Sequence, residues 1–225
     1  MKRFKIVLFM VVITALYGAG VTGLHLGTVK TVQQNRLFIE QKALVELFGL
    51  GDVKKLSKEQ IVRIVDTQID RTESLTDPQT GKTIELLKAY DSAVRDHLIA
   101  YAFPFSGIGF WAEIRGYIAV DSALKKTVGM KVIAQTETPG LGGRIEEPFF
   151  AKPFADGLDI TPPAAGKSYL YMGTPGSKPE PGTAQYGRTF DAITGATQTT
   201  LAMSRMLNEA VAGFSRAAGN RKAGE

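Results

Sequence analysis

The chain has 225 residues, enough for one medium domain plus an extra element, and a net charge of +5. It has no cysteine, which excludes disulfides, thiolate metal sites, thiol catalysis and cysteine-ligated iron–sulfur clusters. Its two histidines, His25 and His97, lie far apart in the sequence, so we expect no metal site and no catalytic residues of the Ser–His–Asp kind. No basic run is interleaved with aromatic residues, so no nucleic-acid role is indicated.

An uncharged segment runs from residue 6 to residue 29, directly after Lys2, Arg3 and Lys5. As a helix, at about 1.5 Å per residue, it is long enough to cross a hydrocarbon layer about 30 Å thick. The basic residues before it predict a cytoplasmic N-terminus and an exported remainder. We expect an uncleaved, single-pass anchor in a bacterial inner membrane. The short apolar core followed by "GAG" leaves a cleaved signal peptide as the alternative.

Residues 30–80 are expected to form a helical stem. An amphipathic helix is predicted to end at Gly49, and "LSKEQI" predicts the start of a second helix. In that start, Ser57 serves as the N-cap and Gln60 completes a capping box. The turn-forming residues of "LTDPQTGKT" then predict a break in the chain.

Between about residues 82 and 136, short β-branched and aromatic runs between turns predict strands, most clearly in "HLIAYAFP", "RGYIAVDS" and "TVGMKVIAQTET". "KSYLYMG" is expected to be another strand. The segment "IEEPFFAKPFADG" is expected to be a short helix or extended. Apolar residues recur at helical spacing near the end, at Met203, Leu207, Ala210, Val211 and Phe214. The pattern predicts an α+β fold: anchor at 1–29, helical stem at 30–80, one mainly antiparallel-sheet domain with a C-terminal helix at 81–215, and a tail at 216–225.

Two glycine-rich segments are candidates for ligand contact. "GIGFWA", residues 107–112, imitates a dinucleotide fingerprint, but no βαβ pattern surrounds it, so we reject that interpretation. Trp111, the only tryptophan, is either a core or a site residue. In "ETPGLGGR", residues 137–144, Pro139 and Gly140 fit a type II turn. The loop is either a simple hairpin turn or a ligand loop to which Glu137 supplies a carboxylate.

The segment "DAITGAT", residues 191–197, directly precedes the predicted C-terminal helix. The first N–H groups of a helix are unpaired and its dipole is positive there, so a phosphate is favoured at this point. Thr194 or Thr197 can cap the helix. Gly195 and Ala196 are small, which leaves the Thr197 hydroxyl accessible. Spacing alone therefore fits both a helix cap and an attachment point.

These motifs together resemble a known family. The last one fits the flavinylation pattern D-x-x-[S/T]-G-A-[T/S] of the FMN-binding domain family at Asp191, Thr194, Gly195, Ala196 and Thr197. "ETPGLG" resembles the family's second signature, and "GIGFWAEIRGYIAVD" resembles its glycine-rich segment; the matches cover residues 85–215 in family order. The position two before Glu137 departs from the family, being Gln135 where histidine is common. The family includes the G subunit of Rnf complexes, the C subunit of sodium-pumping NADH:quinone reductases and stand-alone anchored flavoproteins.

The resemblance implies FMN attached covalently to the Thr197 hydroxyl through a phosphoester, installed by a flavin transferase with FAD as donor. Thr194 would cap the helix or hydrogen-bond the phosphate, and Asp191 would order the loop or serve transferase recognition. Further cofactor-binding positions implied by the resemblance are Trp111, Glu137, Thr138, Gly140, Leu141 and Gly142, together with Gly195 and Ala196.

The function that follows is electron transfer by a membrane-anchored flavoprotein inside an Rnf- or Nqr-type ion-translocating respiratory complex. Its partners would be other membrane subunits of that complex. Two alternatives stay open: a stand-alone exported FMN electron carrier, and a non-redox anchored binding module in which "DAITGAT" is only a helix cap.

Overall fold

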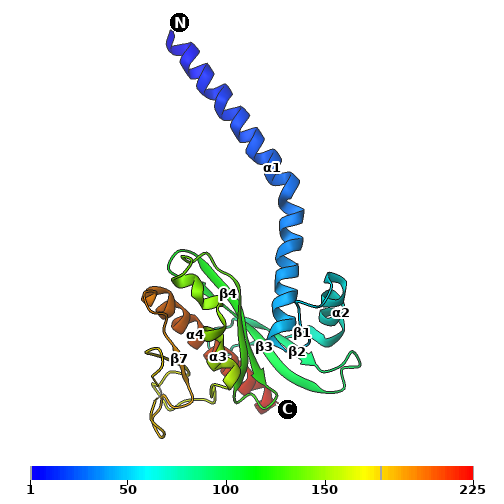
Figure 1. Cartoon of the computed structure of the whole chain (residues 1–225), viewed down its shortest axis with the longest axis vertical. Coiled ribbons are helices and arrows are strands. Elements are labelled where there is room, and N and C mark those ends of the chain that lie inside the picture. Colours follow the sequence, from blue (N-terminus) through cyan, green and yellow to red (C-terminus); the bar gives the residue numbers. More distant parts are fainter. Residues whose placement is uncertain (1, 178, 225) are drawn as a thin grey trace. The chain divides into compact units, whose positions relative to one another are not determined.

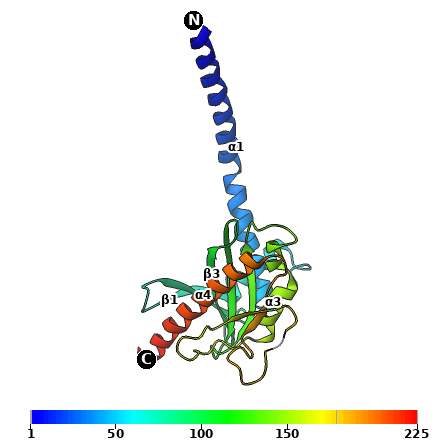
Figure 2. The same cartoon turned by 90° about the vertical axis from the view of Figure 1, so that its left-hand side faces the viewer.

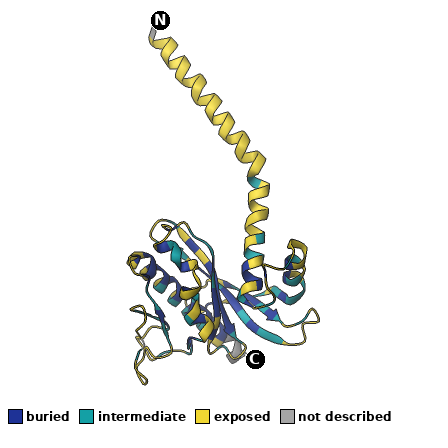
Figure 3. Cartoon of the chain, in the orientation of Figure 1, coloured by how far each residue is buried: buried dark blue, intermediate teal, exposed yellow. Residues whose placement is uncertain are grey.

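A computed structural model describes residues 2–177 and 179–224, and the chain divides into two compact units, residues 1–40 and 41–225 (Figure 1). Helix α1 (Lys2–Leu47) contributes to both units. Among the described residues, only this helix, over Arg3–Leu47, is long and apolar enough to cross a membrane. Its apolar side chains from Phe4 to Leu26 are exposed (Figure 3). By length and composition α1 is therefore consistent with the predicted single-pass anchor.

The predicted stem contains the expected second helix. After α1, Gly49 adopts a positive φ of 66° and turns the chain, and helix α2 (Lys58–Gln68) follows. The Ser57 hydroxyl accepts a hydrogen bond from the Gln60 N–H at 3.3 Å, and the Ser57 N–H donates to Gln60 Oε1 at 2.8 Å. This reciprocal pair is the predicted capping box, because each side chain satisfies a backbone donor that the helix start leaves unpaired.

A five-stranded antiparallel sheet in sequential order forms the centre of the second unit, with strands β1 (Ile69–Thr76), β2 (Thr83–Tyr90), β3 (Leu98–Ile108), β4 (Glu113–Asp121) and β5 (Thr127–Ala134). The three clearest predicted runs are β3, β4 and β5. Strand β1 lies inside the range expected to be helical stem. Its sequence has few apolar residues, and it is extended because it pairs with β2 across the predicted turn, with Leu75 opposite Ile84.

The second half of the chain adds helices and a small parallel pair of strands: 3₁₀ helix η1 (Gly142–Glu146), α3 (Pro148–Asp156), β6 (Tyr171–Gly173), β7 (Thr189–Asp191) and α4 (Thr197–Gly224). The segment "IEEPFFAKPFADG", which was expected to be a short helix or extended, contains the helix α3. It begins with a proline at its first position and stops at Gly157, whose φ is 99°. Helix α4 continues through Gly224, past residue 216, where the tail was expected to begin.

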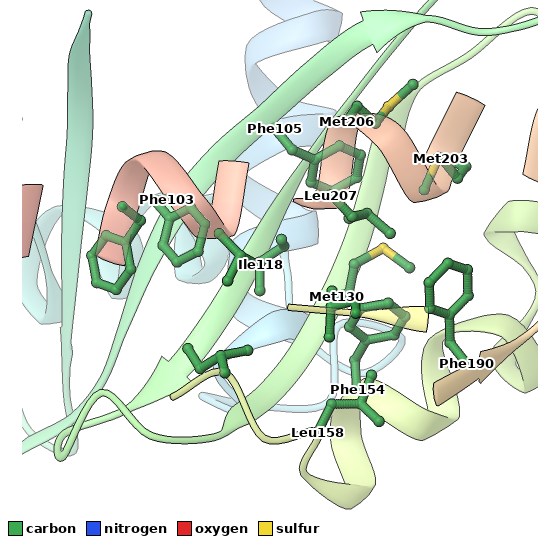
Figure 4. Close-up of a cluster of buried hydrophobic side chains, with 14 of the residues drawn as sticks. Phe103, Phe105, Ile118, Met130, Phe154, Leu158, Phe190, Met203, Met206 and Leu207 are labelled. Atoms are coloured by element: carbon green, nitrogen blue, oxygen red, sulfur yellow. The ribbon is translucent and has the colours of Figure 1, made fainter. Parts of the chain in front are cut away.

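Helix α4 lies across the sheet and packs against β3 (Figure 2). The Phe214 and Phe103 rings stack with centroids 4.2 Å apart, and both side chains are buried. Helix α3 packs against strand β5, at the edge of the sheet next to β4. Figure 4 shows the resulting core, which is built from the labelled residues Phe103, Phe105, Ile118, Met130, Phe154, Leu158, Phe190, Met203, Met206 and Leu207.

The predicted fold class is confirmed: an apolar N-terminal helix precedes an α+β domain with an antiparallel sheet and a C-terminal helix. The packing of α4 on β3 has a consequence for the motifs. It fixes the start of α4, and with it the "DAITGAT" segment, relative to the ends of the central strands.

Candidate functional site

The site is built around the first turn of α4. Gly195 has a φ of 80°, which an L residue rarely adopts, and it turns the chain into the helix at Thr197. The buried Thr200 hydroxyl accepts from the Ile193 N–H at 3.2 Å and donates to the Ala196 carbonyl at 3.0 Å. Thr200 therefore ties the turn to the helix that follows it.

The threonines of this turn fall into two classes. Thr199 and Thr200 are buried, and their hydroxyls are hydrogen-bonded within the protein. Thr194 and Thr197 are exposed, and within residues 2–177 and 179–224 their hydroxyls have no hydrogen bond. Neither exposed hydroxyl therefore acts as a helix cap in this structure. The Thr197 hydroxyl is accessible at a helix N-terminus, as the small residues before it predicted.

The "ETPGLGGR" loop follows β5 and begins with a tight turn. The Leu141 N–H donates to the Thr138 carbonyl at 3.1 Å, and Gly140 has a φ of 74°. A hydrogen bond across four residues, with a positive φ at the third, is the pattern expected of a type II turn. The Gly143 N–H donates to the same Thr138 carbonyl at 3.0 Å, and η1 then starts at Gly142.

Glu137 is the centre of the hydrogen-bond network that joins these loops. It is only 5% exposed, although it is a charged residue type. Its Oε1 accepts from the backbone N–H groups of Phe110 and Trp111 at 2.9 and 3.0 Å. Its Oε2 accepts from the Thr199 hydroxyl at 2.6 Å. One carboxylate thus joins the β3–β4 turn, the loop after β5 and the first turn of α4.

Exposed apolar side chains lie around this network. Trp111 is 66% exposed, and its ring meets that of Phe110 edge to face at 4.9 Å. The Trp111 indole N–H donates to the Thr138 hydroxyl at 3.0 Å. Leu141 is also exposed, and its Cδ2 would lie 3.2 Å from a Cβ added at Gly195. The aromatic tip and the "ETPGLGGR" loop therefore border the segment that carries Thr197.

Asp191 lies at the end of β7 and is half-buried. Its Oδ2 accepts from the Gly176 N–H at 3.4 Å, and the neighbouring Ala192 N–H donates to the Gly173 carbonyl at 2.9 Å. These contacts connect "DAITGAT" to the loop after β6.

The structure brings together most of the predicted site residues and adds two that the sequence interpretation omitted. Phe110 and Thr199 complete the network through Glu137. Thr199 lies four residues before the buried Met203, so the apolar stripe of α4 carried a signal that it faces inward. Phe110 had no such signal, because its position at the tip depends on the β3–β4 register.

A cavity of about 670 Å³ lies apart from these residues, between the β1–β2 turn, β3, residues 167–169 and the middle of α4. On its wall, Arg216 donates to the buried Asp77 carboxylate from Nε and Nη2, at 2.9 and 2.6 Å. These hydrogen bonds from Arg216 hold the pKa of Asp77 well below its usual range. The pair joins the second half of α4 to the β1–β2 turn, so we assign it to the docking of the helix.

Residues 109–212 match the family described as the FMN-binding domain. The C subunit of the Na+-translocating NADH-quinone reductase from Chlamydia caviae is 34% identical over an alignment of 108 residues, covering 44% of this chain and 34% of that protein. The protein of the same name from Pseudomonas aeruginosa is 24% identical over 179 residues, covering 64% of this chain and 68% of that protein. The match thus spans only about a third of the Chlamydia caviae protein's length.

Two solved structures share the fold. The crystal structure of NqrC from Shewanella oneidensis aligns with a TM-score of 0.62 and 19% identity, over 85% of this chain and 99% of that chain. The C subunit of the Na+-translocating NADH-quinone reductase from Parabacteroides distasonis aligns with a TM-score of 0.64 and 21% identity, over 83% and 95%. These two structures bear on the fold alone, and the family resemblance that the three motifs indicated is borne out by the match at residues 109–212.

Proposed function

We propose that this chain, whose residues 109–212 match the FMN-binding domain family, is a membrane-anchored electron-transfer flavoprotein with FMN linked to Thr197. When bound, FMN supplies one- and two-electron redox chemistry, and the protein supplies its position and surroundings. The observation that carries the attachment point is the contrast among the threonines of one turn. Thr197 combines exposure, an unbonded hydroxyl and the helix N-terminus, whereas Thr199 and Thr200 are buried and bonded.

The residues around Thr197 fit a phosphate ester. The N–H groups of the first helical turn lack partners within the helix, and the helix dipole favours negative charge at this end. Because Gly195 has no side chain, the space between its backbone and Leu141 Cδ2, which would lie 3.2 Å from an added Cβ, is not filled. Thr194 is exposed two residues before Ala196 and offers a second free hydroxyl beside the ester. A phosphodiester at Thr197 therefore finds donors and no obstructing side chain.

The surroundings also fit a flat, largely apolar ring system. Trp111, Phe110 and Leu141 expose large apolar side chains next to this turn, which a soluble surface rarely groups without a partner. A Cβ added at Gly140 would meet nothing within 4 Å, so that face of the loop is open. We assign Trp111 and Leu141 as the packing surface for the isoalloxazine, with Thr138 holding the indole in place.

The attachment reaction balances with FAD as the donor and a flavin transferase as the catalyst. The Thr197 hydroxyl oxygen forms a bond to the FMN phosphorus, the pyrophosphate P–O bond of FAD breaks, and AMP leaves. The hydroxyl proton is released to solvent or to the transferase. No electron changes hands in this step, so no oxidant is required.

We further propose that the chain works as an NqrC-like subunit of an ion-translocating respiratory complex. The curated relatives are named as the C subunit of Na+-translocating NADH-quinone reductase, which supports this assignment. Helix α1 would anchor the chain in a bacterial inner membrane, with Arg3 and Lys5 on the cytoplasmic side and the flavin domain outside. Electrons would then enter and leave the flavin through neighbouring membrane subunits.

Intact-mass measurement after co-expression with a flavin transferase tests the attachment. We expect the wild-type chain to gain the mass of FMN less one water. Thr197→Val should lose the adduct and Thr197→Ser should keep it, because only the hydroxyl is required. Gln198→Ala, exposed on the next residue of the helix, is the matched control and should be modified fully. An unmodified wild-type chain in the presence of an active transferase would exclude the covalent flavin and favour an anchored binding module.

A stand-alone exported flavin carrier is the second candidate. It is favoured by the short span of the match, which covers 34% of the Chlamydia caviae protein. Co-purification from native membranes separates the two candidates. Recovery of multi-span membrane subunits in fixed stoichiometry with the flavinylated chain supports the complex, whereas a flavinylated chain recovered alone supports the carrier.

A further inference from the structure

We propose that Glu137 is a positioning residue, which latches the Phe110–Trp111 turn to the first turn of α4 and thereby fixes the Trp111 indole at the flavin face. The latch itself follows from contacts within the chain, and only its effect on the flavin rests on the proposed function. Glu137 lies 27 and 26 residues from the two amides that it binds, and 62 residues from the Thr199 hydroxyl. Three segments distant in sequence therefore depend on one carboxylate.

Both oxygens of this carboxylate are engaged by the protein. Oε1 accepts two backbone N–H groups and Oε2 accepts the Thr199 hydroxyl, and the residue is almost fully buried. A carboxylate in this state has no free face to offer a ligand. Its action on a bound flavin is therefore indirect, through the residues that it holds.

Two glycines, Gly109 and Gly142, pack closely against the Glu137 carboxylate. A Cβ added at Gly109 would lie 2.5 Å from Glu137 Oε1, and one added at Gly142 would lie 2.8 Å from Oε2. Real Cβ atoms do not approach other atoms so closely, so both glycines are required where they stand. The Glu137 N–H donates to Gln135 Oε1 at 2.6 Å, which restrains the backbone of the latch.

The latch restrains Trp111 at two points. Glu137 holds its backbone N–H, and the adjacent Thr138 accepts its indole N–H at 3.0 Å. Trp111 nevertheless remains 66% exposed, so its ring is ordered by hydrogen bonds and not by burial. An ordered, exposed indole, on a turn that Glu137 joins to the first turn of α4, is preorganised to pack against a flat ring, because the cost of ordering it is met before the ligand binds.

The single tryptophan of the chain makes the latch directly measurable. The ¹⁵N order parameter of the Trp111 backbone amide, measured on the unflavinylated full chain in a membrane mimic, reports the order of the turn. We expect a value of about 0.85 in the wild type and below about 0.6 in Glu137→Ala. Glu137→Gln keeps an oxygen for the two amides and a polar partner for Thr199, so it should retain most of the order. Glu146→Ala removes an exposed carboxylate from the same region and should change nothing.

Thr199→Val tests the same latch if Glu137→Ala does not fold. It removes only the hydroxyl that donates to Glu137 and keeps the shape of the side chain. It should lower the Trp111 order parameter to an intermediate value. If Thr199→Val, or a folded Glu137→Ala, leaves the Trp111 order parameter at the wild-type value, the latch is wrong.

A second readout uses the flavinylated chain. Trp111 packed on the isoalloxazine quenches flavin emission, so Glu137→Ala should raise that emission to the level of Trp111→Leu. The double variant should be no brighter than either single one, because both changes act on the same contact. Adduct formation is scored separately by mass. A wild-type chain without the adduct contradicts the proposed function, and the latch is then tested by the Trp111 amide measurement alone. If the adduct forms and Glu137→Ala leaves the flavin emission unchanged, the latch has no role at the flavin.

Discussion

The glycines of the "ETPGLGGR" loop differ in what a methyl group would meet, and this gives a graded prediction of stability. In Gly142→Ala the new Cβ would lie 2.5 Å from the Thr199 hydroxyl oxygen, 2.8 Å from Glu137 Oε2 and 2.9 Å from Glu137 Cβ. All three atoms belong to buried residues, so none can move into solvent. In Gly140→Ala the Cβ meets open space, and only the φ of 74° is unfavourable.

These distances set the expected magnitudes. Overpacking a buried site costs about 1–3 kcal/mol, and displacing the Thr199–Glu137 hydrogen bond costs about 1.5–3 kcal/mol more, so Gly142→Ala should lower the free energy of unfolding by about 2.5–6 kcal/mol. Gly140→Ala should lose about 1 kcal/mol, the cost of placing an L residue in the left-handed region. At about 2–4 °C per kcal/mol for a domain of this size, the Tm should fall by about 10 °C and about 3 °C.

Thermal unfolding of the full chain in a membrane mimic, followed by near-ultraviolet circular dichroism, measures both shifts. Gly143→Ala is the matched control. The atom nearest to its added Cβ would be the Thr138 carbonyl oxygen, at 3.3 Å, and the φ of Gly143 is not positive. Its Tm should change less than that of Gly140→Ala. If Gly140→Ala proves as destabilising as Gly142→Ala, the close packing of Gly142 on the Glu137–Thr199 pair does not exist, and the latch loses its structural basis.

Two further predictions concern the attachment of α4 to the rest of the domain. Phe214→Ala removes a buried ring stacked on Phe103 and should cost about 3–5 kcal/mol by chemical denaturation, whereas Phe149→Ala, at an exposed ring, should cost far less. The second prediction follows from Arg216, whose hydrogen bonds hold the pKa of Asp77 below its usual value of 3.8. The stability contributed by Asp77 is complete above that value and is lost as the pH falls toward the lowered pKa in the folded protein. The Tm should therefore fall less between about pH 5 and about pH 2 in Arg216→Gln than in the wild type, and equal falls would contradict the assignment.

Much of the fold could be predicted because its signals are local. The capping box at Ser57 and Gln60 is formed by residues three positions apart, and the apolar stripe of α4 repeats within a few turns. Strand β1 could not be predicted, because its own residues carry little apolar alternation. Its conformation depends on pairing with β2, a contact that the segment itself does not encode.

The site divides in the same way. The "DAITGAT" motif, its position before a helix and the accessible Thr197 could be inferred from neighbouring residues in the chain. The role of Glu137 could not, because its three partners lie 26 to 62 residues away and meet it only after β3, β5 and α4 have packed. The motif alone left open a simple hairpin turn or a ligand loop with Glu137 as its carboxylate, and in the structure that carboxylate is buried inside the protein.

The sequence by itself determined the apolar N-terminal helix, the strand runs, the capped helix α2, the apolar stripe of α4 and the family motif, since each is a pattern of residues close together in the chain. Only the tertiary structure decided that the hydroxyls of Thr199 and Thr200 are buried and hydrogen-bonded within the protein. It also decided that one buried carboxylate joins three loops. Burial and long-range hydrogen bonds depend on the packing of α4 across the sheet, and no single segment specifies that packing.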